Sequence, residues 1–263
     1  MKKSKFKLPI RLIAIIIIIF LAFGCIIGYI WKFLKTADYF KIKDIITRGD
    51  SKVDLSYLKG KNIFSVDLKN ESRYILEYYP DCSKISLVRL LPDRIFVDFI
   101  KRKPIGFVKL YRYFAVDEGG VLFYSLSQPQ DLELPIILGL ETKIFGPESG
   151  KSYNIKELML ALNIIKEAKR NRVFKNYKIK KIDVTNTANA SIFISFSSNV
   201  SDYPKGQPVS KWEDLEVKLG ENKIDDKIAI LGGLIIQEKF DLANIKYIDL
   251  RFKEPLIKLK DAK

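Results

Sequence analysis

Residues 146–152, with the sequence GPESGKS, come closest in this chain to a motif that could bind a nucleotide. In the phosphate-binding loop that they resemble, an arc of backbone N–H groups wraps the phosphates and a lysine reaches the outer ones. That loop needs four residues between its glycines, whereas three separate Gly146 from Gly150 here. Because the missing residue displaces the arc of donors, we predict a polar turn at this place rather than a nucleotide site.

Paired carboxylates are further candidates for catalysis, whereas the chain contains no histidine. This excludes catalytic triads with an imidazole base and metal sites with imidazole ligands. Asp225-Asp226 and Asp117-Glu118 could supply acids for glycoside hydrolysis, but adjacent acids are usually surface charges. The two cysteines, Cys25 and Cys82, form no paired metal-binding motif. We therefore predict no catalytic residue, no metal site and no cofactor, and an enzymatic function is at a disadvantage from composition alone.

An uncharged apolar segment, residues 12–31, predicts a transmembrane helix. At about 1.5 Å per residue, the segment is long enough to cross the hydrocarbon core of a bilayer. Basic residues without any acid precede it, and Tyr29 and Trp31 mark its far edge. We therefore predict a cytoplasmic tail (1–11), a spanning helix (12–31) and exported domains. A cleaved signal peptide is the alternative, but its apolar region would be shorter.

The chain carries a net charge of +15, and 48% of its residues are hydrophobic. This apolar content is too high for a disordered chain. The basic residues are spread along the sequence and alternate with acids or strand residues, which is typical of a solvated surface. Binding to an anionic lipid or polymer is the alternative interpretation, and we expect no nucleic-acid partner.

Residues 39–104 predict a small domain with the element order β-α-α-β-β. Asp67 can cap the second helix, and Pro80 stops it. Apolar residues alternate with polar ones on both sides of residues 91–94, which have the sequence LPDR. This alternation predicts a β-hairpin with a proline turn.

Residues 105–263 predict a mixed, β-rich domain with two helices. Asn154 and Glu157 form a capping pair for the first helix, and the second runs over residues 223–238. The sequence DEGG at residues 117–120 predicts a turn between strands 107–115 and 121–124. An apolar stretch follows at residues 134–139, and the other predicted strands are 180–184, 190–196, 215–219, 245–252 and 256–260.

Several segments, in their order along the chain, resemble the FtsQ/DivIB family of bacterial cell division proteins. Lys101 stands where that family usually has glutamate, which is a departure from its pattern. The segments similar to the family's POTRA domain are residues 40–49, Leu58, 62–67, 91–93, Val97 and 101–104. Those similar to its following β domain are residues 117–123, 134–135, 138–139, 217–220 and 247–252.

The resemblance implies an α+β fold with one N-terminal transmembrane helix, a POTRA domain (39–104) and a β domain (105–263). It also implies a non-enzymatic scaffold of the bacterial divisome in the inner membrane at the division septum. Such a scaffold would bind FtsB/FtsL-type partners, bind other divisome proteins through the POTRA domain, and help control septal peptidoglycan synthesis. The family's partner contact lies at its last strands, which here match Phe252, Leu256, Ile257, Lys258 and Leu259.

An exposed β-edge would explain such a contact, because its unpaired N–H and C=O groups can receive a partner strand. Pro255 fits an edge position, since it has no N–H to donate. The alternative for each apolar residue of this run is that it faces the domain core. Two other functions stay open: a carboxylate-dependent cell-wall hydrolase and a membrane-anchored protein that binds an anionic polymer.

Overall fold

The computed structural model describes residues 10–49, 54–125, 129–197, 212–237 and 242–260. The fold is α+β with an N-terminal apolar helix and a β-rich C-terminal part, as the sequence predicts. The chain divides into two compact units. The first contains Met1–Tyr78 and Cys82–Lys101, and the second contains Tyr79–Asp81 and Arg102–Lys263.

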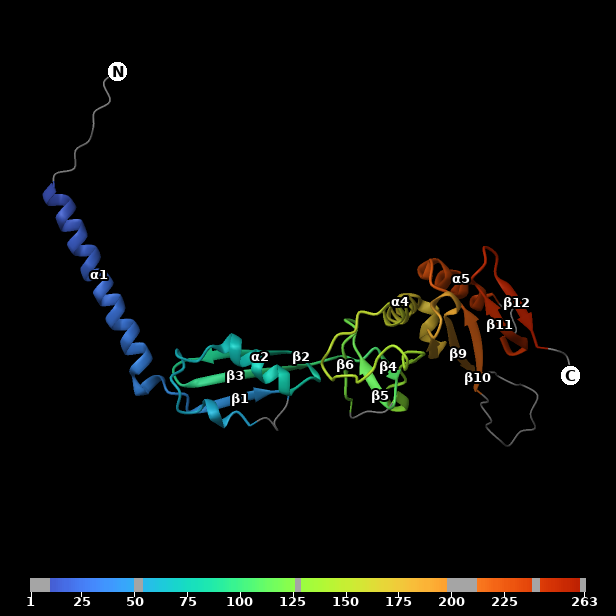
Figure 1. Ribbon diagram of the computed structural model, residues 1–263, viewed down its shortest axis with the longest axis horizontal. Helices are drawn as coiled ribbons and strands as arrows, with labels where there is room; N and C mark the ends of the chain where they lie inside the picture. Colours follow the sequence, from blue (N-terminus) through green and yellow to red (C-terminus); the bar gives the residue numbers. More distant parts are fainter. Residues whose placement is uncertain (1–9, 50–53, 126–128, 198–211, 238–241, 261–263) are drawn as a thin grey trace, which may run out of the picture. The chain divides into compact units, whose positions relative to one another are not determined.

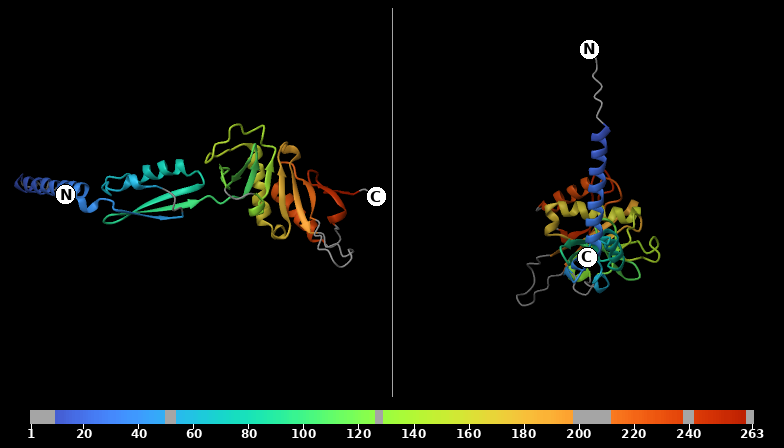
Figure 2. Two further views of the ribbon diagram at one scale, coloured as in Figure 1. Left: turned by 90° about the horizontal axis from the view of Figure 1, so that it is seen from below. Right: turned by 90° about the vertical axis from the view of Figure 1, so that its left-hand side faces the viewer.

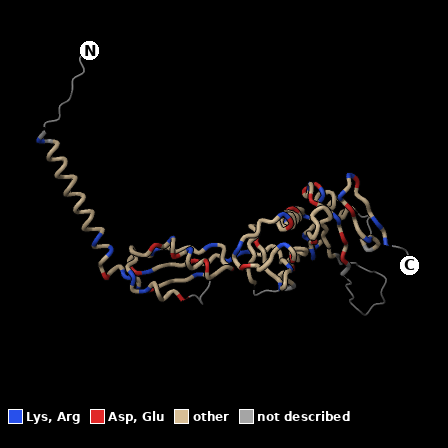
Figure 3. Tube along the Cα trace, in the orientation of Figure 1, with Lys and Arg blue, Asp and Glu red and all other residues tan. Residues whose placement is uncertain are grey.

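The N-terminal helix α1 (Ile10–Thr36) is long and apolar enough to cross a membrane. Its stretch Ile13–Thr36 includes a window with a mean hydropathy of 3.0, and none of that window is buried by protein. The helix is almost free of charged residues until Lys32 and Lys35 near its end (Figure 3). Apolar side chains that no protein covers are stable in lipid, so α1 suits a single membrane span. Residues 1–9 of the predicted cytoplasmic tail lie outside the described residues.

The first unit contains a three-stranded sheet in the order β1-β3-β2 (Figure 1). β2 (Cys82–Leu90) and β3 (Arg94–Lys101) form the predicted hairpin, and β1 (Asp44–Arg48) pairs in parallel with β3. The first predicted helix is a short 3₁₀ turn, η2 (Ser56–Leu58), and another, η1 (Asp38–Phe40), precedes β1. The core is made of buried aliphatic side chains, among them Ile42, Leu58, Ile63, Ile75, Ile85, Ile95 and Val97.

The helix α2 (Leu68–Tyr78) packs against β2 in the first unit. Asp67 caps it as predicted, because its carboxylate accepts from the backbone N–H groups of Lys69 at 3.1 Å and Asn70 at 3.2 Å. These bonds satisfy donors that a helix N-terminus leaves unpaired. Pro80 follows two residues after the last helical residue, where the sequence predicts the stop.

The second unit is built on a nine-stranded sheet in the order β12-β11-β10-β9-β8-β7-β4-β5-β6. Figures 1 and 2 show α4 (Lys156–Arg170) and α5 (Ile224–Ile236) on the same side of this sheet. Their buried side chains share one core with the strands, and the short helix α3 (Pro129–Leu132) precedes β7. The strands are β4 (Gly106–Lys109), β5 (Tyr113–Val116), β6 (Leu122–Phe123), β7 (Ile136–Leu138), β8 (Lys178–Asp183), β9 (Ser191–Ser197), β10 (Trp212–Lys218), β11 (Ile245–Asp249) and β12 (Leu256–Leu259). The 3₁₀ turns are η3 (Arg172–Lys175), η4 (Thr187–Asn189) and η5 (Leu242–Asn244).

Some predicted elements differ locally from the observed ones. The expected strand 107–115 is a hairpin, because the chain turns where the Leu110 N–H donates to the Arg112 carbonyl at 2.9 Å. The expected cap of α4 by Asn154 is wrong: Ile155 is the N-cap residue and makes no side-chain capping bond. The second helix predicted for this unit, α5, has an expected end at Glu238, which lies outside the described residues.

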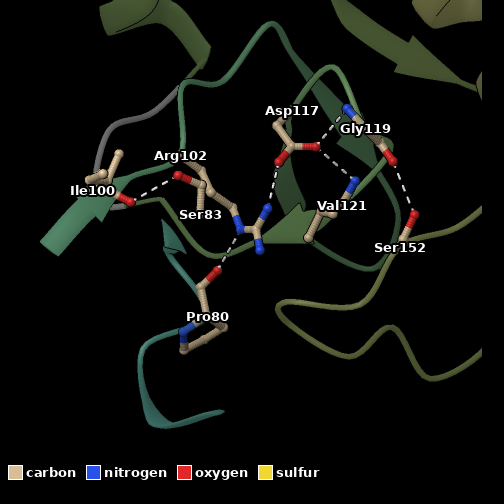
Figure 4. Close-up of polar contacts among 8 residues, drawn as sticks. All are labelled: Pro80, Ser83, Ile100, Arg102, Asp117, Gly119, Val121 and Ser152. Carbon is tan, nitrogen blue, oxygen red and sulfur yellow. Dashed lines mark hydrogen bonds and ion pairs between the residues drawn. The ribbon is translucent and has the colours of Figure 1, made fainter. Parts of the chain in front are cut away.

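A half-buried ion pair fixes the beginning of the second unit (Figure 4). The Arg102 guanidinium donates to the Pro80 carbonyl at 3.0 Å and to the Asp117 carboxylate at 2.7 Å. The other oxygen of Asp117 accepts from the N–H groups of Gly119 and Val121, both at 3.0 Å. Asp117 therefore shapes the turn that the sequence predicts at residues 117–120. In the first unit, Figure 4 also shows the Ser83 hydroxyl donating to the Ile100 carbonyl.

Candidate partner-binding edge

The strand β12 forms one edge of the nine-stranded sheet. It pairs antiparallel with β11, with Ile257 opposite Ile248 and Lys258 opposite Tyr247. Within the described residues, no second strand pairs with its outer side. The outer side therefore presents backbone N–H and C=O groups to which another strand can bind. Pro255 directly precedes β12, so its missing N–H removes no donor from the strand itself.

The side chains of β12 alternate between the two faces of the sheet. Ile257 is half-buried and packs against the main core, whereas Leu256 and Leu259 are 53% and 59% exposed. Apolar side chains that remain this exposed at an open edge are suited to contact with another protein. Lys258 points the same way as Leu256, because residues two apart in a strand share a face. The edge thus combines two exposed leucines with one cation.

Phe252 lies in the turn that joins β11 to β12 rather than on a strand. The predicted strand 245–252 ends at Asp249, and the chain bends over residues 251–254. The Phe252 ring is 58% exposed, and the Arg251 guanidinium lies 5.8 Å from its centroid. The structure brings Phe252 and β12 into one C-terminal hairpin. That Phe252 and the residues of β12 contact a partner stays a prediction.

An ion pair that the sequence analysis missed holds this turn. Asp249 is 4% exposed, and its carboxylate accepts from the backbone N–H of Arg251 at 3.0 Å and from its guanidinium at 2.6 Å and 2.9 Å. Arg251 also donates to the side-chain oxygen of Asn189. The sequence contains one signal of this pair, the pattern Asp-x-Arg at the end of an apolar strand. The pattern does not reveal that the aspartate is buried.

The pKa of Asp249 lies below its ordinary value, because the hydrogen bonds from Arg251 favour the carboxylate more than burial opposes it. In the unfolded chain an aspartate has a pKa of about 3.9. A lowered pKa in the folded state means that the pair stabilises the fold above this value, and that the contribution is lost as the pH falls further.

Asp249→Asn is therefore expected to lower the free energy of unfolding by roughly 1–3 kcal/mol at pH 7, and by less at pH 3. Urea unfolding of the second unit at both pH values measures the difference. Glu118→Gln removes an exposed acid and serves as the control, with little expected effect at either pH. An equal loss from Asp249→Asn at pH 7 and pH 3 would contradict the role given to the carboxylate.

The residues that the sequence analysis considered for nucleotide binding or catalysis have local structural roles. Lys151 forms an ion pair with Glu148 at 3.1 Å, and the Ser152 hydroxyl donates to the Gly119 carbonyl at 3.0 Å (Figure 4). Asp225 and Asp226 lie in the first turn of α5, where negative charge favours the helix dipole. In the part of the chain that the structure describes, no group of three or more histidine, cysteine or acidic residues could hold a metal ion.

Comparison with curated proteins shows relatives that match along almost the whole chain. The cell division protein FtsQ of Syntrophotalea carbinolica is 22% identical over 248 residues, which cover 92% of this chain and 80% of the relative. The FtsQ proteins of Geotalea daltonii and Koribacter versatilis are 22% and 20% identical, and the matches cover 90% and 97% of this chain and 82% and 70% of the relatives. No family model matches the chain.

Along almost its whole length the chain resembles the FtsQ/DivIB family. This confirms the resemblance found in the sequence and makes the chain a cell division protein. The FtsQ relatives are named for cell division and not for an enzymatic reaction. Together with α1, the family suggests a single-pass membrane protein at the division site.

Proposed function

We propose that this chain is a divisome scaffold that binds an FtsB/FtsL-type membrane partner by strand addition to β12. The open outer side of β12 is the observation that carries the proposal. A partner strand would pair its backbone with this edge, and alternate side chains of the partner would contact Leu256 and Lys258 on one face and Leu259 on the other. Main-chain bonds would provide affinity, while these side chains would provide selectivity.

The opposite edge of the same sheet supports the choice of β12. That edge is β6, which consists of Leu122 and Phe123, and both side chains are buried. A two-residue strand offers few backbone groups, whereas β12 has four residues and exposed leucines beside it. Among the edges of the nine-stranded sheet, β12 is therefore the better site for a partner strand.

In this proposal α1 spans the inner membrane, with its N-terminus in the cytoplasm and both compact units outside. The basic residues that precede the apolar segment favour this orientation. The scaffold acts without catalysis: it holds its partner at the septum and thereby helps control septal peptidoglycan synthesis. The first unit, which we interpret as a POTRA domain, is the candidate surface for other divisome proteins.

A photoreactive amino acid at position 259 tests the proposal in cells. We expect a covalent product with a small coiled-coil membrane protein, because the Leu259 side chain lies at the open edge. The same amino acid at position 159 is the matched control, since Met159 is an exposed apolar residue on α4. Depletion of the protein should also block septation. Products of equal yield from both positions, or normal septation after depletion, would overturn the proposal.

A further inference from the structure

The end of the three-stranded sheet at which the chain arrives from α1 is separated from that helix by a short connection. Residues 37–43 connect Thr36, the last residue of α1, to β1. Even fully extended, such a segment spans only about 25 Å. β1 and β3 are parallel and Asp44 lies opposite Arg94, so the turn between β2 and β3 is at the same end of the sheet.

Hydrogen bonds hold this end together and join it to α1. The Lys43 N–H donates to the Asp93 carbonyl at 2.9 Å, which fixes the incoming chain against the β2–β3 turn. The Asn62 side-chain amide donates to the carbonyl of Leu34 at 2.9 Å. Leu34 belongs to the last turn of α1, so this bond pairs a carbonyl that a helix C-terminus leaves free. The β2–β3 turn is therefore kept near the end of the membrane helix.

Exposed apolar side chains lie at this end beside basic ones. Tyr39 is 64% exposed and Leu91 is 61% exposed. Lys41, Lys43 and Arg94 are also exposed, and Figure 3 shows basic residues at the end of α1 and on the chain that follows it. These five residues, Tyr39, Lys41, Lys43, Leu91 and Arg94, are called the membrane-proximal surface below.

The cations of this surface are themselves exposed, and they pair with the exposed Asp38 and the half-buried Asp93. Lys41 pairs with Asp38 at 2.8 Å, Lys43 pairs with Asp93 at 3.2 Å, and Arg94 lies 3.9 Å from Asp93. The side chains of Lys43 and Arg94 are 66% and 58% exposed. Exposed ion pairs contribute little to stability, so these cations can exchange a carboxylate for a lipid phosphate.

We propose that the membrane-proximal surface docks on anionic lipid headgroups of the bilayer that α1 spans. Tyr39 and Leu91 enter the interfacial layer, where aromatic and aliphatic side chains lose contact with water. Lys41, Lys43 and Arg94 contact lipid phosphates, to which basic residues near an anionic surface are attracted. Docking holds the first unit at the membrane more firmly than its connection to α1 alone. The proposal depends on α1 spanning a membrane and not on the partner that binds β12.

Hydrogen exchange of the full chain in lipid nanodiscs tests this docking. Nanodiscs that contain anionic phosphatidylglycerol are compared with nanodiscs of phosphatidylcholine alone. We expect amides of residues 39–43 and 91–95 to exchange at least about fivefold more slowly in the anionic nanodiscs, which is the effect of one cation at an anionic surface. Residues 74–78 are the internal control, because α2 ends at the opposite end of the sheet, where Cys82 lies opposite Lys101.

Two variants separate docking from proximity to the bilayer. Lys41→Gln, Lys43→Gln and Arg94→Gln together should abolish the difference between the two lipids. Leu91→Ser, which retains every charge and all ion pairs, should reduce it. Tyr78→Ser is the matched control, since Tyr78 is as exposed as Tyr39 but lies at the far end. Equal exchange in both lipids, equal slowing at residues 74–78, or a lipid effect that survives in the variant with all three cations replaced would overturn the proposal.

Discussion

Leu259→Glu is expected to weaken capture of the membrane partner by about 30- to 100-fold while the second unit stays folded. Leu259 is the last residue of β12 and is exposed, so the substitution costs the isolated protein little. A partner strand on the outer side of β12 would take the new carboxylate out of water without giving it a cation. An uncompensated polar group of this kind costs roughly 2–3 kcal/mol.

The loss is measured as the dissociation constant of the purified complex, together with the thermal unfolding midpoint of each variant. Met159→Glu is the matched control, because it makes a similar exchange at an exposed position of α4. Phe252→Ala tests the turn separately and should weaken capture without adding charge. If Leu259→Glu and Phe252→Ala both bind the partner normally, the C-terminal hairpin is not the binding surface.

Gly139→Ala is expected to lower the free energy of unfolding of the second unit by about 3 kcal/mol or more. Gly139 follows β7 with a φ of +90°, which an alanine adopts only with strain. A Cβ atom at this position would also lie 2.3 Å from the Thr185 backbone nitrogen and 2.5 Å from its Cα atom. The obstacle is backbone rather than the end of a flexible side chain, so the connection between β7 and β8 must shift.

Gly233→Ala, in the same unit, is expected to raise the free energy of unfolding. Gly233 lies within α5, and a Cβ atom there would meet no atom within 4 Å. An alanine should therefore stabilise the helix by about 0.5–1 kcal/mol. Pulse proteolysis in urea measures both variants against the unsubstituted chain. A loss below about 1 kcal/mol for Gly139→Ala would show that the turn tolerates a side chain.

Local sequence patterns predict most elements of the fold but not the order of the strands. The alternation of residues around Leu91 and Pro92 predicts the β2–β3 hairpin, and Asp67 correctly predicts the start of α2. Local patterns do not predict the parallel pairs β4–β7, β7–β8 and β10–β11, because each pair brings together strands that are distant in the sequence. Such pairing depends on how whole elements pack, and no short motif encodes it.

The same limit applies to the candidate binding edge. The sequence indicates that residues 256–260 form a strand, and Pro255 suggests an edge. Whether the outer side of that strand is open depends on the position of β11 and β10 in the sheet, which the sequence does not give. The burial of Asp249 is likewise a consequence of tertiary packing, and alternation of charges cannot reveal it.

The parallel pairing of β10 with β11 has a consequence for the order of assembly. A parallel neighbour needs a crossover, and here α5 lies between the two strands in the chain. β11 and β12 are also the last strands of the sheet to emerge during translation. A growing polypeptide in which β12 has not yet formed therefore lacks the proposed partner-binding edge. Under the proposed function, partner binding would therefore select chains in which β12 is already paired with β11.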